Sequence, residues 1–556
     1  MYADLHSFPA AFAYDFVRLR EEEVHLPKHP WAIPPSKPQR LLKPKGQAGY
    51  SQTDLAKCIR SNTRLVFASL SPIEKGFFIG VKGSSIDKQF IIDLHDRWHN
   101  EGDKATCNWL IAQLKHRAGI EKISEKDLQF LCSRSMNLQA FQVKKMQNGH
   151  YDYFEALKHE YGFFLERSGR YTTSEYPIQI DSQGIPRKWQ GAYTLAANGN
   201  EIDLDPNEDD IIIVPTIGGI HSLGIGNPED ADLRPGQAPN DVDIATLKHR
   251  IRQIKGEEPL ENGPVCRWQH KPFYITFASH FFNTLCGHAK SFPKPASILF
   301  DQRKGQNLGV LSGCIEIWRE LLGLTHELEP SGSARILIDV HYMSAAARFE
   351  YYKNIIYPFN QKHKDNPIPV IASHAAYAGT DYLQNLIDRA KKDPDKDISF
   401  DKGFLTWDIN LTDEDILQIF HSQGLLGLSL DNLLLGGGSQ TKWLDKVPFS
   451  PLVRRRNRNL IKRTLMQFVR TPFDYHVHNP HTIWQRLALG SGFDGFMQPM
   501  NRYNSVLQFS TFESDLIQIL DEMKREEPVW FAHHRSEDLA RMICFDNAYE
   551  FVKKHY

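Results

Sequence analysis

Residues 336–341 read ILIDVH, and residues 345–363 shortly after them read AAARFEYYKNIIYPFNQKH. The first stretch is a nearly continuous apolar run, which is typical of a strand buried on both faces. The second has the length and amphipathic character of a helix. The pair is then repeated, with IPVIAS from Ile368 followed by TDYLQNLIDRAKK from Thr380. Strand and helix in alternation predict a parallel sheet covered by helices.

The same kind of apolar run occurs eight times along the chain. The runs are YADLH from Tyr2, RLVFASL from Arg64, IIIVPT from Ile211, FYITFA from Phe273, ILIDVH from Ile336, IPVIAS from Ile368, LLGLSL from Leu425 and RLALGS from Arg486. Eight strands separated by helices predict an α/β fold, a (β/α)8 TIM barrel spanning residues 1–556 as a single domain. An open doubly wound sheet would place a Gly-rich turn after its first strand. The sequence there is SFPAAFA, which disfavours that alternative.

Two segments exceed the needs of a minimal barrel. Residues 24–50 are rich in Pro and Lys and predict an extended excursion over the surface, a candidate lid. Residues 171–210 alternate short β-like pieces with turn residues and predict a β-hairpin insertion.

Charge and cysteine usage limit the classes of partner. Among 556 residues, 66 Lys and Arg oppose 67 Asp and Glu, so no overall field favours nucleic acid or an anionic membrane. The basic run RRRNRNLIKR, 454–463, is interpreted as a solvated helix face rather than a phosphate contact. Seven scattered cysteines without a C-x-x-C pair indicate a reducing compartment. With no signal peptide or transmembrane run in the sequence, we expect a cytoplasmic protein; self-association is left open.

Polar side chains stand at the carboxyl ends of the expected strands, where barrels place their chemistry. They are Asp4 and His6, Ser69, Thr216, His280, Asp339 with His341 and Tyr342, Ser373 and His374, Asp431, and Asp494. Imidazoles and carboxylates that converge on one mouth are typical of a metal-assisted hydrolase.

Each of these residues also has a structural interpretation. His280 could be a hydrogen-bonded residue of the pocket wall, and Asp339 a buried acceptor that orders its strand end. Asp494 could cap the segment that follows it.

In the order of its motifs the chain resembles the membrane (renal) dipeptidase family of zinc peptidases, within the amidohydrolase superfamily of barrels. The motifs are ADLHSFP, RLVFASLSPIEKGFF, IVPTIGGIHSLG, FYITFASHFFNTLCGHA, RILIDVHYMSAAAR, IPVIASHAAYAG, GLLGLSLDNLLLG and LALGSGFDG. The resemblance extends to about Asn504 and is greatest to the longer cytoplasmic bacterial members.

The resemblance implies six ligand positions for two zinc ions, of which only His6 and His374 keep a ligand. The other four are occupied by Phe8, Ile217 (or, with a one-residue shift, Thr216), Tyr342 and Gly492. An imidazole lies one residue before the fifth-strand position, at His341. Strand side chains alternate in direction, so we expect His341 to point away from the pocket.

The resemblance also implies roles for residues around the ligands. His280 corresponds to the family's histidine at the scissile carbonyl, and Asp494 to an acid that shuttles a proton. The substrate pocket would contain Tyr342, His221, Phe8 and Ala378, the last in place of an arginine that holds the substrate carboxylate.

Two imidazoles without a protein carboxylate hold zinc weakly. The sequence therefore predicts one weakly bound zinc ion at most, or none, and an inactive or greatly altered relative that binds a small peptide or amide. The alternative is a hydrolase of dipeptides or other small amides with one metal on His6, His374 and Asp494 and with His280 polarising the carbonyl. A further alternative is metal-free acid–base chemistry by Tyr342 and the histidines.

Overall fold

The computed structural model describes residues 1–11, 13–14, 29–31, 51–81, 84–101, 103–118, 138–148, 151–173, 179–180, 186–188, 190–204, 210–225, 241–261, 265–293, 296–392, 400–437 and 451–556. The excursion predicted at 24–50 lies outside these residues except for 29–31. No described helix is long and apolar enough to cross a membrane.

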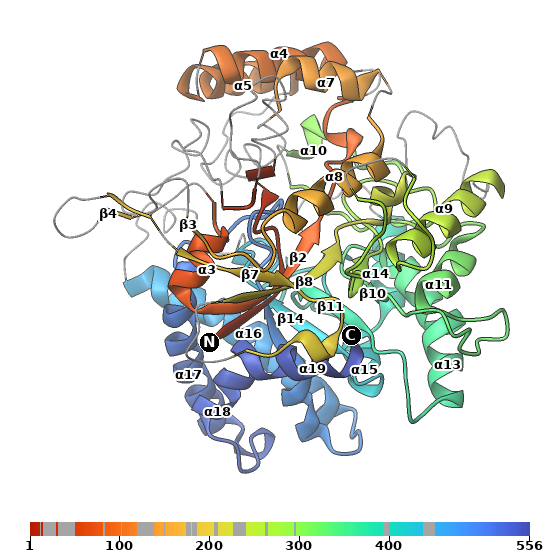
Figure 1. Cartoon of the computed structure of the whole chain (residues 1–556). Helices are drawn as coiled ribbons and strands as arrows, with labels where there is room; N and C mark the ends of the chain where they lie inside the picture. Colours follow the sequence, from red (N-terminus) through yellow and green to blue (C-terminus); the bar gives the residue numbers. More distant parts are fainter. Residues whose placement is uncertain are drawn as a thin grey trace.

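Eight parallel strands, paired in chain order, form the central barrel (Figure 1). They are β1 (Tyr2–Ser7), β2 (Thr63–Leu70), β8 (Ile211–Ile217), β9 (Tyr274–Thr276), β10 (Leu337–Asp339), β11 (Ile371–Ala375), β14 (Leu425–Ser429) and β15 (Leu487–Gly490). Each coincides with one of the eight apolar runs, and the predicted (β/α)8 barrel is confirmed.

The barrel closes between its last strand and its first. The backbone N–H of Gly492 donates to the carbonyl of His6 at 2.9 Å, and that of Phe8 donates to the carbonyl of Phe493 at 3.1 Å. The buried carboxylate of Asp4, in β1, accepts from the backbone N–H and the hydroxyl of Ser491 at 2.9 and 2.5 Å. Residues 4 and 491 are thus joined at the seam that turns the sheet into a barrel.

Helices alternate with the strands and cover the outside of the barrel (Figure 1). They include α3 (Leu55–Ser61), α8 (Tyr153–Leu165), α9 (Asp241–Ile254), α11 (Cys314–Leu322), α12 (Ala345–Tyr351), α13 (Tyr357–Lys362), α14 (Leu383–Lys392), α15 (Asp413–His421), α16 (Pro451–Asp474), α17 (Phe509–Glu526) and α18 (Ser536–Arg541). The helix predicted at 345–363 is interrupted by a π-helical turn, Tyr352–Ile356. Pro358, which has no N–H to continue the α-helical ladder, lies two residues after the end of this turn.

The inside of the barrel is filled by apolar side chains, and the C-terminal helix α19 (Asn547–His555) closes its amino-terminal end. Phe551 of this helix packs edge-on against Phe273, with ring centroids 5.9 Å apart. The Tyr556 hydroxyl donates to the carbonyl of Ala196 at 2.8 Å. The interior of the barrel is therefore a packed core that α19 covers at its amino-terminal end.

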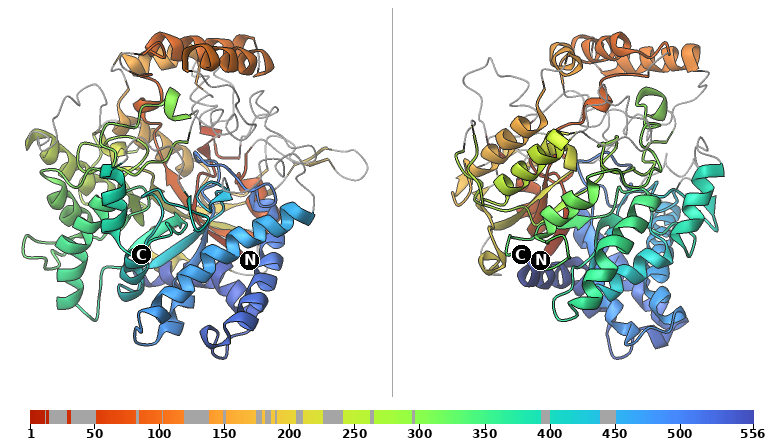
Figure 2. Two further views of the ribbon diagram at one scale, coloured as in Figure 1. Left: turned by 180° about the vertical axis from the view of Figure 1, so that it is seen from behind. Right: turned by 90° about the vertical axis from the view of Figure 1, so that its right-hand side faces the viewer.

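A helical cap lies over that end. It consists of α4 (Lys88–Asn100), α5 (Asp103–Ala118) and α7 (Ala140–Gln147), inserted between β2 and β8 (Figures 1 and 2). The cap has its own apolar cluster, which includes Phe78 and Trp98 and continues down to Phe77, Phe281 and Phe292 at the mouth. These three helices were not predicted from the sequence.

The segment 171–210 contains two short antiparallel pairs. β3 (Thr172–Thr173) pairs with β6 (Gln190–Gly191), and β4 (Gln179–Ile180) pairs with β5 (Pro186–Arg187). A further strand, β7 (Tyr193–Leu195), pairs in parallel with β8 outside the barrel path. The division of the chain into a barrel and two excursions stays a prediction.

The basic run 454–463 lies on the helix α16, but only part of it is the predicted solvated face, because Arg456 is buried. Three of its charges, on Arg454, Arg458 and Lys462, face the acidic side of α17. Arg454 is 3.0 Å from Asp515, and Lys462 is 2.6 Å from Glu526. These ion pairs place the run at a helix–helix contact.

Candidate functional site

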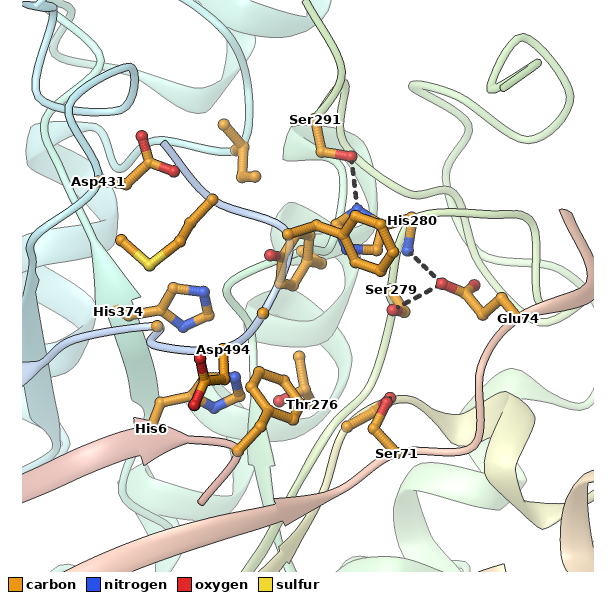
Figure 3. Close-up of a pocket in the computed structure, with 18 of the residues that line it drawn as sticks. His6, Ser71, Glu74, Thr276, Ser279, His280, Ser291, His374, Asp431 and Asp494 are labelled. Carbon is orange, nitrogen blue, oxygen red and sulfur yellow. Dashed lines mark hydrogen bonds between the residues drawn. The ribbon is translucent and has the colours of Figure 1, made fainter. Parts of the chain in front are cut away.

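A cavity opens at the carboxyl ends of the strands, beneath the cap (Figure 3). Its volume is about 60 Å³. Eight residues that the sequence singled out line this cavity: His6, Phe8, His280, Tyr342, His374, Asp431, Gly492 and Asp494. Strands far apart in the sequence therefore deliver the predicted residues to one place.

His6 and His374 lie face to face on one side of the cavity (Figure 3). Their ring centroids are 4.2 Å apart and their planes differ by 15°. Burial lowers the pKa of His6 to about 3 and that of His374 well below its usual value. Both imidazoles are therefore neutral near pH 7.

The tautomers of these two rings follow from their partners. The Tyr274 hydroxyl donates to the carbonyl of Leu5 at 2.6 Å, so it accepts from Nδ1–H of His6 at 3.1 Å. In the same way, the Ser373 hydroxyl donates to Asp339 at 2.6 Å and accepts from Nδ1–H of His374 at 3.0 Å. In both rings the remaining nitrogen, Nε2, carries a lone pair.

His341 is fully buried beside this pair. Its ring centroid is 3.9 Å from that of His374 and 4.5 Å from that of Tyr342. Neither of its ring nitrogens has a hydrogen-bond partner among the residues that the structure describes. The side chain does not line the cavity, as alternation along the strand predicts, but it contacts a residue that does.

Asp339 is a buried acceptor that binds three strand ends together. Its carboxylate accepts from the hydroxyls of Thr276 and Ser373 at 2.7 and 2.6 Å, and from the backbone N–H groups of His341 and Ser373 at 3.1 and 3.0 Å. Burial raises its pKa despite these donors. These contacts are those expected of a buried acceptor that orders the end of its strand.

Asp494 lies on the cavity wall with its carboxylate already bound (Figure 3). It accepts from the backbone N–H groups of Gln52 at 2.8 Å and Thr53 at 3.1 Å. Burial raises its pKa to about 7. The acid thus holds the turn before α3, a segment distant in sequence, rather than the residues that follow it.

Gly492 leaves room for the stacked imidazoles because it has no side chain. Its φ is +71°, and a Cβ placed on it would lie 3.1 Å from Cδ2 of His374. The left-handed backbone and the close contact both favour glycine at this position.

We expect Gly492→Ala to destabilise the protein by about 2–3 kcal/mol, from backbone strain of about 1–2 kcal/mol and crowding of His374. Gly169→Ala is the matched control, because Gly169 has the same φ of +71° and nothing within 4 Å of its Cβ position. Urea denaturation of both variants measures the difference. Equal costs would show that the contact with His374 contributes nothing.

His280 and Tyr342 occupy another side of the cavity. Their ring centroids are 4.9 Å apart in an edge-to-face arrangement. Nδ1 of His280 is 2.9 Å from the Ser291 hydroxyl, and burial lowers the pKa of His280 to about 3. Within the described residues, the Tyr342 hydroxyl has no hydrogen-bond partner, and burial raises its pKa well above the usual value.

Glu74 is a residue of the cavity wall that sequence reasoning missed. Its carboxylate accepts from the backbone N–H groups of His280 and Phe281 at 3.1 and 3.0 Å, and from the Ser279 hydroxyl at 2.9 Å (Figure 3). Its signal in the sequence is weak, since it is a single acid in SPIEKGFF, four residues after β2 ends.

Two predicted pocket residues lie outside the cavity wall. Nε2 of His221 is 2.9 Å from the carbonyl of Pro72. Ala378 is fully buried, and its backbone N–H donates to the carbonyl of Leu411 at 2.8 Å. Both residues therefore contact the backbone of loops around the cavity and not the cavity itself.

The arrangement does not fit the two-zinc centre that the resemblance implies. In the described part of the chain, no group of three or more His, Cys, Asp or Glu side chains is placed to hold a metal ion. The ring planes of His6 and His374 are nearly parallel, so their lone pairs do not meet at the zinc–nitrogen distance of about 2 Å. The nearby acids are bound to hydroxyl or backbone N–H donors.

Comparison with known proteins gives only distant structural likenesses. No protein-family model and no curated protein matches the chain. A metallopeptidase of Rhodobacter sphaeroides, solved with a phosphinate mimic of L-Ala-D-Ala, is similar at 11% identity and a TM-score of 0.42, over 100% of this chain and 99% of its own. The metallopeptidase dipeptidase AC has 11% identity and a TM-score of 0.40, over 93% of each chain. A Pseudomonas aeruginosa structure described as the probable dipeptidase PvdM has 12% identity and a TM-score of 0.38, over 98% and 99% of the two chains.

Proposed function

We propose that this protein is a dipeptidase-like barrel that binds a small amide or peptide in its cavity without two-zinc hydrolysis. The observation that carries the proposal is the parallel stack of His6 on His374, at 4.2 Å, in the place where the resemblance expects converging metal ligands. The only acid left from the eighth-strand motif, Asp494, accepts two backbone N–H groups.

The protonation states also favour binding over proton transfer. A general acid or base is most effective when its pKa lies near the working pH. Burial lowers the pKa of His6 and of His280 to about 3, and raises that of Tyr342 well above neutrality. None of these three groups changes its protonation near pH 7, which disfavours the metal-free chemistry by Tyr342 and the histidines. Asp494, whose pKa of about 7 does lie in that range, already accepts two backbone N–H groups.

The alternative function is hydrolysis of a small amide with one zinc ion. One observation favours it: His341 lies against His374, and its two buried nitrogens have no partner in the described part of the chain. Together with the Nε2 lone pairs of His6 and His374, it could complete a three-imidazole set if the rings reoriented.

Metal analysis separates the two functions. We expect purified protein, after incubation with zinc and gel filtration, to retain less than about 0.1 zinc per chain, because a site without three converging ligands is weak. Elemental analysis measures the ratio, with His374→Ala as the control. About one zinc per chain, lost in His374→Ala, together with turnover of dipeptides, would establish the alternative.

A further inference from the structure

We propose that Gln302 and Ser291 are positioning residues that hold His280 as the Nε2–H tautomer, and that this N–H and the Tyr342 hydroxyl form a two-donor site for the carbonyl oxygen of an uncharged amide. The inference rests on the proposed function, since it specifies the ligand of the same cavity. Its argument begins at Gln302, a buried side chain that the sequence did not single out.

The orientation of the Gln302 amide is fixed by its acceptor contacts. Its Oε1 accepts from the backbone N–H groups of Ser291 at 3.1 Å and Phe292 at 2.9 Å. A side-chain NH₂ could not take those positions, because it has no lone pair to offer. Nε2 is therefore the donor, to the carbonyl of His280 at 2.6 Å and to the Ser291 hydroxyl at 2.7 Å.

The Ser291 hydroxyl transmits this orientation to the imidazole. Its oxygen already accepts from Gln302, so its single hydrogen is free to be donated. Among the described residues, its other hydrogen-bond contact is Nδ1 of His280, at 2.9 Å. Donation to Nδ1 requires a lone pair there, which places the imidazole hydrogen on Nε2. The low pKa of this ring keeps it neutral, so only one of its nitrogens carries hydrogen.

The two sides of the cavity then differ in polarity. His280 and Tyr342, with rings 4.9 Å apart, offer two hydrogens on one side. His6 and His374 offer Nε2 lone pairs on the other side, because their Nδ1–H groups are used by Tyr274 and Ser373 (Figure 3). An amide has both a carbonyl acceptor and N–H donors, so it can satisfy both sides at once.

Charge on the wall disfavours an anionic ligand. Glu74 and Asp494 line the cavity, and no Lys or Arg is among the described residues that do. A ligand carboxylate would meet acids of the same sign without a cation to balance it. Aromatic walls such as Phe8 and Phe77 suit the apolar body of the ligand.

Nitrogen-15 NMR of the histidine side chains tests the tautomer directly. In the wild type we expect the His280 ring to show a protonated Nε2 and an unprotonated Nδ1. Ser291→Ala removes the donor to Nδ1 and should give a mixture of tautomers, whereas Ser291→Thr keeps a hydroxyl and should restore the wild-type pattern. Gln302→Glu, which lacks the amide donor, should also give a mixture. A protonated Nδ1 in the wild type, or no change in Ser291→Ala, would overturn the proposal whatever the protein binds.

Four compounds on one ring test the ligand class by NMR titration: benzamide, acetophenone, benzoate and benzamidine. We expect benzamide to bind most tightly, acetophenone more weakly because it lacks N–H donors, and the two charged compounds weakest. Tyr342→Phe should weaken benzamide about 5- to 10-fold, the effect of one lost hydrogen bond. Equal affinities for all four, or no binding of any, would overturn the amide assignment. Zinc binding measures the proposed function independently, so the two failures are distinguishable.

Discussion

Replacing Arg348 by alanine is expected to lower the free energy of unfolding by about 3–5 kcal/mol, the cost of breaking a buried ion pair from one side. Arg348 and Asp415 are both fully buried, with Nε 2.9 Å from Oδ1 of the acid. The guanidinium also donates to the carbonyls of Met343 at 2.8 Å and Asp408 at 2.5 Å. A third carbonyl, that of Asn410, accepts from the guanidinium at 3.2 Å, so the alanine variant leaves a buried carboxylate and three carbonyls without this partner.

Urea denaturation followed by tryptophan fluorescence measures this loss. Arg303→Ala is the matched control, because Arg303 pairs with Asp301 at 2.7 Å with its side chain 68% exposed. We expect that control to cost at most about 1 kcal/mol. A double variant, Arg348→Met with Asp415→Leu, should recover part of the loss by removing both charges. Equal effects of Arg348→Ala and Arg303→Ala would show that burial does not strengthen the first pair.

The second large effect is a dependence of the free energy of unfolding on pH, which is caused by Asp494. Its pKa is raised from 3.8 to about 7 by burial, so the folded state binds a proton that the unfolded state has lost. The stabilisation is present below about pH 4 and is lost as pH rises through 7. Relative to Asp494→Asn, the wild type should therefore lose about 2–4 kcal/mol between pH 4 and pH 8.

Unfolding curves of the wild type and Asp494→Asn at several pH values measure this change. The variant keeps a residue that tolerates the positive φ of 63° at this position, so backbone strain is matched. Asp4, whose pKa burial raises to about 6, titrates in both proteins, and its contribution cancels in the difference. Parallel pH profiles of the two proteins would show that Asp494 has an ordinary pKa.

The barrel itself could be predicted because its signal is repeated. Eight apolar runs separated by helices repeat the same local pattern, and each of the eight runs overlaps one observed strand. The helical cap over 88–147 could not be predicted in this way, because its helices belong to no repeated unit and pack on a separate cluster.

The cavity was predicted in part. The position of strand ends was sufficient to bring His6, His280 and His374 to one mouth, together with Asp494. Glu74 was missed because it follows its strand by a loop, where alternation no longer indicates direction. The placement of Ala378 away from the wall was missed for the same reason, since it also lies beyond the end of its strand.

By itself, the sequence determined the order and number of the strands and the residues at their ends. Only the tertiary structure decided which of these side chains have hydrogen-bond partners and how their rings are oriented. It showed that Asp494 is held by Gln52 and Thr53, and that Gly492 leaves room for His374 to stack on His6. The physical reason is that side-chain identity follows from the sequence, whereas hydrogen-bond partners, ring orientation and pKa depend on neighbours that come from strands and loops hundreds of residues apart.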